Sequence, residues 1–93
     1  MVSAIWKDTT IVASDETVIV EGNHYFAPSA VDQSLLEAST RTSVCPIKGP
    51  AKYFNIRAGG TLHANAAWTY PEPNPVAEAI RGHFAFRKGV HVA

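Results

Sequence analysis

Short runs of β-branched and other apolar residues, separated by polar or Gly- and Pro-containing links, dominate the chain. Thr9–Ala13 and Thr17–Val20 are rich in Thr, Val and Ile, which favour strands. Ser14–Glu16 is a polar link that suits a tight turn, so the pattern predicts a hairpin here. We expect the second strand to continue toward Phe26 and to end at Pro28, with Gly22–Asn23 available for a bulge or turn if the strand stops early.

Apolar residues recur at helical spacing in two places. Ser29 is suited to cap a short helix that runs to about Ala38, and its apolar positions are Val31, Leu35 and Leu36. The second predicted helix is Val76–Arg81, which begins just after Pro75 and can end at Gly82. We expect these two short helices to close the openings of a β fold.

The Gly59–Gly60 pair separates two further β-prone segments, Lys52–Arg57 and Thr61–Trp68. Because glycine readily adopts positive φ, this arrangement predicts a second hairpin. Strand alternation assigns six residues to its inward face: Phe54, Ile56, Leu62, Ala64, Ala66 and Trp68. His63 and Asn65 are then expected on the opposite face.

The rest of the chain also favours strands over helices. Thr40–Val44 is β-prone and leads into Cys45–Pro50, where two prolines and a glycine indicate a rigid loop. His83–Phe86 reads as a core strand, and Lys88–Gly89 permits a turn into Val90–Val92. The predicted fold is therefore mainly β: a compact bent β-sheet or small barrel-like single domain over residues 1–93, with two short helices.

Composition narrows the classes of partner. The 93 residues carry eight Lys plus Arg and eight Asp plus Glu, so the formal net charge is zero. A neutral chain has no global field that would attract nucleic acid or an anionic membrane, and we expect neither as a partner. Zero net charge also removes a barrier to self-association, which permits a homodimer.

The single cysteine and the absence of long apolar runs indicate the cellular compartment of the protein. Cys45 cannot form an internal disulfide, which fits a reducing compartment. The N-terminal residues lack a basic leader, and no apolar run approaches the roughly 20 residues of a membrane span. We therefore expect a cytoplasmic protein.

Three ordered motifs resemble one known family. They are Val20–Phe26, Cys45–Tyr53 and Ala66–Pro73, within a similarity that runs from about Trp6 to Phe86. The chain resembles the domain-of-unknown-function family 427, which is also catalogued as nucleotidyltransferase-like. The resemblance implies a compact β-rich domain with no established reaction, so it indicates fold and leaves function open.

Two positions depart from the family pattern. Ile47 stands where the resemblance leads us to expect an aromatic residue between Cys-Pro and Lys-Gly, and Ala30 stands where relatives often have Asp. Any role of an aromatic or acidic side chain at these two places is therefore not carried over to this chain.

The family motifs contain the candidate catalytic residues Cys45, Lys48 and Glu21. Lys48 is close enough in sequence to stabilise a Cys45 thiolate, and His63 or His24 could act as its base; the alternative is a small buried cysteine. Glu21 could be a general base or bind an ammonium, and the alternative is a structural ion pair. Lys48–Gly49 and Lys52 could instead hold an anion, or form a tight turn with exposed lysines.

Aromatic residues supply the candidate ligand-binding group. Tyr25, Trp68 and Tyr70 could line a pocket or pack the core, and His63 is added to this group. The histidines lack the spacing of a zinc site, and the aspartates form no paired motif for phosphate-bound metal ions. The sequence therefore indicates no metal site and no cofactor.

Three functions remain open from the sequence, and whether the domain is an enzyme is among the open points. The leading hypothesis is a small-molecule or enzyme-like pocket where Glu21–Tyr25, Cys45–Gly49 and Trp68–Tyr70 meet. A non-catalytic interaction module or homodimer is the second, and nucleotidyl transfer, suggested by the family label alone, is the third.

Overall fold

Antiparallel strands build most of the molecule. A computed structural model describes residues 1–87 and 89–93, and nine strands lie within that part of the chain. One sheet has the order β2-β1-β9, formed by β1 (Val2–Trp6), β2 (Thr9–Ser14) and β9 (His91–Val92). A two-stranded sheet pairs β3 (Val18–Val20) with β4 (Asn23–Tyr25). The largest sheet has the order β5-β6-β7-β8, formed by β5 (Leu36–Cys45), β6 (Gly49–Ala58), β7 (Thr61–Thr69) and β8 (Phe84–Phe86).

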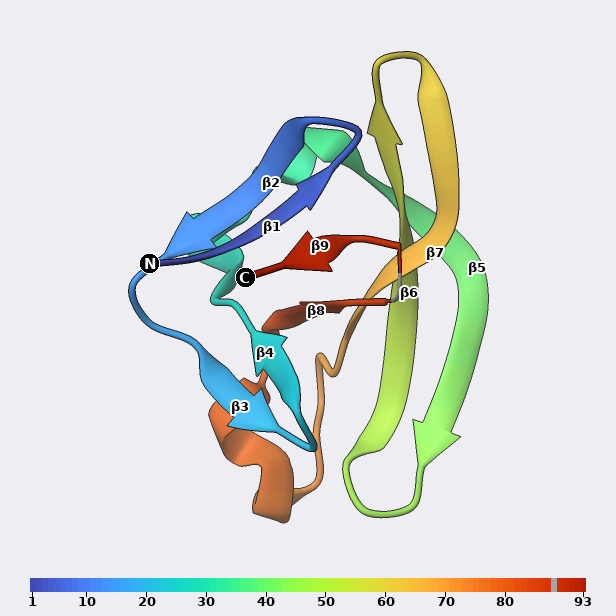
Figure 1. Cartoon of the computed structure of the whole chain (residues 1–93). Coiled ribbons are helices and arrows are strands. Elements are labelled where there is room, and N and C mark those ends of the chain that lie inside the picture. The colour runs from blue at the N-terminus through green and yellow to red at the C-terminus, as the bar shows by residue number, and fades with distance from the viewer. Residues whose placement is uncertain (88) are drawn as a thin grey trace.

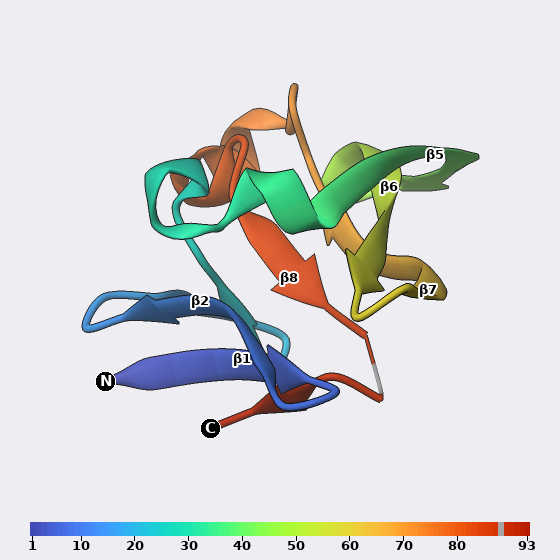
Figure 2. The ribbon, with the colours of Figure 1, turned by 90° about the horizontal axis from the view of Figure 1, so that it is seen from above.

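The two small sheets lie beside the large one. Figure 1 shows the long strands β5, β6 and β7 along one side of the molecule and the small sheets on the other, and Figure 2 shows β1 and β2 as a separate layer. Phe26, just after β4, makes a bridge to Phe84 of β8, and Val12 of β2 makes one to Val31. The first bridge joins the two-stranded sheet to the large one, and the second joins β2 to the segment between β4 and β5.

Two apolar clusters form the core. The larger lies between the β1–β2 layer and the large sheet and includes Ile11, Phe26 and Ile56. The smaller surrounds Tyr25 and Ile80. Strand β8 serves both, because Phe84 and Phe86 belong to the larger cluster while Ala85 between them belongs to the smaller. Alternation along a strand explains this division.

The mainly β prediction is confirmed, and so is the hairpin at Gly59–Gly60. These glycines have φ values of 58° and 76° and connect β6 to β7. The predicted strand Thr40–Val44 lies inside the longer β5, and His83–Phe86 corresponds to β8. The predicted turn at Lys88–Gly89 includes Lys88, which lies outside the described residues.

The two predicted helical segments roughly match tighter 3₁₀ turns, and the second, Val76–Arg81, is offset by one residue from the observed Pro75–Ile80. The 3₁₀ turns are η1 (Pro28–Ala30), η2 (Gln33–Leu35) and η3 (Pro75–Ile80). The predicted continuous helix to Ala38 is wrong, because Asp32 has an extended backbone and accepts a bond from the N–H of Ser34. Leu36 already pairs with Ile56 in the sheet. No helix in the described part of the chain is long and apolar enough to cross a membrane.

The predicted hairpin of Thr9–Ala13 with Thr17–Val20 is also wrong. Strand β2 instead pairs with β1 through Lys7–Asp8, and β3 pairs with β4 through Glu21–Gly22. Both links have positive φ at both residues, the conformation that matches the twist of a two-residue hairpin. The polar link between β2 and β3 therefore connects two sheets.

The predicted faces of β7 are inverted at its start. His63 lies opposite the buried Ile56, whereas Leu62 is 42% exposed and Ala64 is also exposed. The cause is a bulge, since Asn65 has φ 55° and the β6–β7 register shifts beside it. An unpaired residue changes which side chains point inward.

Candidate functional site

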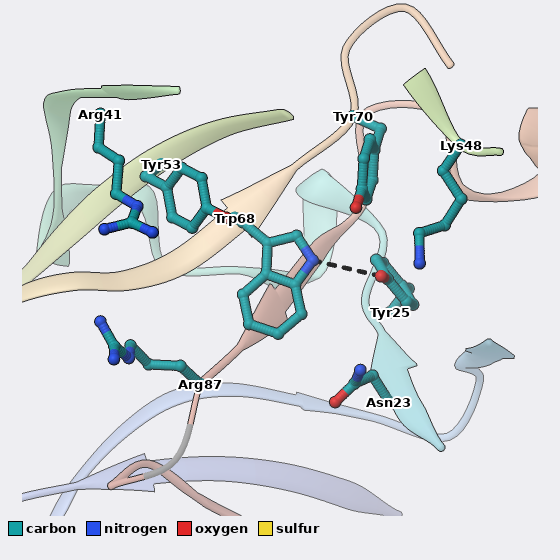
Figure 3. A pocket seen from close by; sticks show the side chains of 8 residues that line it. All are labelled: Asn23, Tyr25, Arg41, Lys48, Tyr53, Trp68, Tyr70 and Arg87. Carbon is teal, nitrogen blue, oxygen red and sulfur yellow. Dashed lines mark hydrogen bonds between the residues drawn. The ribbon is translucent and has the colours of Figure 1, made fainter. Parts of the chain in front are cut away.

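A cavity of about 320 Å³ opens where β4, β5, β6 and β7 meet the β5–β6 turn and the residues that follow β7 and β8. Asn23 and Tyr25 come from β4, and Trp68 comes from β7. The β5–β6 turn contributes Lys48, because its three residues Pro46–Lys48 connect Cys45 directly to Gly49. The complete lining is shown in Figure 3: Asn23, Tyr25, Arg41, Lys48, Tyr53, Trp68, Tyr70 and Arg87.

The aromatic walls of this cavity are fixed by contacts among themselves. The Nε1–H of Trp68 donates to Oη of Tyr25 over 3.2 Å, and the two rings meet nearly edge-on at 6.4 Å between centroids. Tyr70 also packs against Tyr25, at 6.4 Å between ring centroids. Tyr25 is 1% exposed, so the core anchors the group. Such rigid aromatic walls suit a planar or apolar ligand.

Three cationic side chains complete the lining. The guanidinium of Arg41 lies 5.0 Å from the Tyr53 ring centroid, and Nζ of Lys48 lies 5.7 Å from that of Tyr70. Figure 3 shows Arg41 and Arg87 on one side of Trp68, with Lys48 near Tyr25 and Tyr70 on the other. Among the described residues, neither arginine forms an ion pair with a carboxylate.

Glu21 pairs with Lys48 at the margin of the cavity. The Glu21 side chain is 66% exposed, whereas that of Lys48 is 13% exposed. The hydrogen bond that the Lys48 ammonium donates to the Glu21 carboxylate raises the pKa of Lys48, and burial raises the pKa of Tyr70. Lys48 therefore stays cationic and Tyr70 stays neutral at physiological pH, which keeps the positive charge of the site.

Cys45 lies beside the cavity without lining it. It ends β5, is half-buried, and packs against the cluster that contains Tyr25 and Tyr70. The backbone N–H groups of Lys48 and Ile47 lower the pKa of the Cys45 thiol. The turn thus favours a thiolate mainly through its backbone.

The structure brings together most of the predicted site residues. Tyr25, Lys48, Trp68 and Tyr70 line one cavity, and Glu21 and Cys45 adjoin it. His63 lies elsewhere, stacked on Trp6 at 5.3 Å between ring centroids.

Neither histidine considered as a base for Cys45 contacts it. Nε2 of His63 is buried and has no hydrogen-bond partner within the described residues. Nδ1 of His24 lies 2.7 Å from the hydroxyl of Thr17. No group of three or more His, Cys, Asp or Glu residues in the described chain could hold a metal ion.

Four lining residues were not predicted: Asn23, Arg41, Tyr53 and Arg87. Asn23 and Tyr53 lie within the family motifs, so their position in the sequence could have identified them as candidates. Arg41 and Arg87 come from strand regions with no motif around them. Only the pairing of β5, β6, β7 and β8 brings these arginines to one cavity.

The fold and the cavity define a class: small antiparallel-β domains with an aromatic site lined by cations. The chain belongs to the family described as Domain of unknown function (DUF427), labelled NTP_transf_9, whose model matches residues 1–92. The predicted family is thereby confirmed. None of the curated proteins compared with the chain matches it.

Proposed function

We propose that this domain binds a small planar organic anion in the cavity around Trp68. One observation carries the proposal: three cations and four aromatic rings line the same space, and among the described residues no carboxylate lines it. Glu21 neutralises only Lys48, so Arg41 and Arg87 remain available for an anion.

In this proposal, cationic side chains bind the anionic group of the ligand and aromatic side chains pack against its ring. The face of Tyr53 holds Arg41 in place while leaving its N–H donors free for a carboxylate or phosphate. The edge of Trp68 is fixed by its bond to Tyr25, so its ring is a preorganised wall for a flat ligand. We also propose a cytoplasmic setting, because a half-buried free cysteine suits a reducing compartment.

Isothermal titration calorimetry with 1-naphthoate and its uncharged isostere 1-naphthamide tests this proposal. We expect 1-naphthoate to bind more tightly than the amide, and Arg41→Gln to weaken 1-naphthoate binding about tenfold, the size of one charge-assisted hydrogen bond. Arg57→Gln is the matched control, because Arg57 pairs with Glu37 on the same sheet and does not line the cavity. Equal affinity for the two probes, or equal effects of the two substitutions, would reject an anion site.

A further inference from the structure

A second hollow is lined in part by Lys48. It is an apolar groove of about 300 Å³ between the end of β3, the β5–β6 turn and η3. In Figure 1, η3 is the orange coil beside β3. The side chains that matter here are Val20, Ile47, Val76 and Ile80. Ile47 is 66% exposed and Val76 is 77% exposed, so apolar surface faces water here.

Lys48 is the one residue shared by the groove and the aromatic cavity among the described residues. Its side chain is largely covered and its ammonium is paired with Glu21. A lysine whose charge is held at its tip presents an apolar methylene stem to its neighbours. The boundary between the two hollows is therefore compatible with an apolar chain that crosses it.

We propose that the groove is a second subsite for the same ligand and takes an unbranched apolar chain. This inference rests on the proposed function. With the anionic group at Arg41 and Arg87 and the ring along Trp68, the far end of the ligand is directed toward Lys48 (Figure 3). Lys48 also lines the groove. The ligand class is thus an amphipathic organic acid: an anionic, planar head that bears an aliphatic chain.

Calorimetry with benzoate and with 4-ethyl-, 4-butyl- and 4-hexylbenzoate tests the second subsite, each used below its aggregation limit. Each methylene that enters the groove should tighten Kd about fourfold, given the transfer free energy of a buried methylene. Val76→Asn should abolish this dependence on chain length and leave the Kd of benzoate itself unchanged. Val44→Asn is the matched control, because Val44 is 75% exposed and does not line the groove.

The outcomes separate the inference from the proposed function. If all the benzoates bind with one affinity, or if Val44→Asn acts as Val76→Asn does, the second subsite is wrong and the anion cavity stands. If none of them binds, both proposals are wrong. If sedimentation reveals a dimer that Val76→Asn dissociates, a second copy of the chain occupies the groove and the inference is overturned.

Discussion

At the scale of single residues, Cys45 shows how a backbone can set the chemistry of a side chain. Its thiol pKa is lowered first by the N–H groups of Lys48 and Ile47, and the charge of Lys48 contributes less. The nearby carboxylate of Glu21 acts in the opposite direction. The effect therefore belongs to the turn conformation more than to any one ionic neighbour.

We predict that the Cys45 thiolate persists when the lysine charge is removed. In the native protein, the rate of alkylation by iodoacetamide should reach its plateau at lower pH than in the urea-unfolded chain, because a lowered pKa leaves more thiolate at a given pH. Lys48→Ala keeps the backbone N–H, so its profile should move only slightly toward higher pH. A Lys48→Ala profile equal to that of the unfolded chain would assign the effect to the charge instead.

The cavity residues that could be predicted from the sequence are those that lie in short sequence motifs. Tyr25, Lys48 and Trp68 stand in short motifs, and a motif can be read without knowledge of the fold. Arg41 and Arg87 are 46 positions apart in the sequence and meet only through sheet pairing. Their convergence depends on strand order, which local pattern does not encode.

At the scale of elements, the hairpin turns differ in how tightly they are enclosed. Gly49 begins β6 with φ 105°, and a Cβ there would lie 3.2 Å from the backbone N of Asn74. Asn74 cannot easily move away, because its N–H donates to the carbonyl of Lys48 over 2.9 Å. At Gly59 a Cβ would meet nothing within 4 Å, although φ is positive there too.

We predict that Gly49→Ala destabilises the fold more than Gly59→Ala does. Backbone strain alone should cost about 1 kcal/mol at Gly59, whereas strain plus the contact with Asn74 should cost about 2–3 kcal/mol at Gly49. Urea denaturation followed by far-UV circular dichroism measures both, with Gly59→Ala as the reference for strain without contact. Equal losses would show that the Asn74 segment yields freely.

The presence or absence of glycine explains which turns could be predicted from the sequence. Gly59–Gly60 is recognisable because glycine favours positive φ, and that hairpin was predicted correctly. Lys7–Asp8 adopts φ values of 52° and 60° without a glycine, so tertiary pairing of β1 with β2 overrides local preference there. The bulge at Asn65 is held by a bond from its N–H to the side chain of Asn55, a contact invisible in local pattern.

At the scale of the whole molecule, β8 joins the two core clusters. Its neighbouring side chains enter opposite clusters, so displacement of β8 would remove packing from both clusters. The bridge between Phe26 and Phe84, with N–H···O distances of 2.8 and 2.9 Å, also links β4 to β8. A chain of this size with shared core elements should unfold in one step.

The two tryptophans allow this cooperativity to be measured, because Trp6 packs on the larger cluster and Trp68 on the smaller. In Trp6→Phe the remaining fluorescence reports the smaller cluster, and in Trp68→Phe it reports the larger one. We predict that within each variant the fluorescence and far-UV circular dichroism midpoints in urea coincide. Trp68→Phe also removes the hydrogen bond to Tyr25, so its midpoint should fall by an amount equivalent to about 1 kcal/mol without losing that coincidence. A fluorescence transition that precedes the loss of strand signal in either variant would mean that the clusters unfold separately, and that β8 does not couple the aromatic cavity to the rest of the fold.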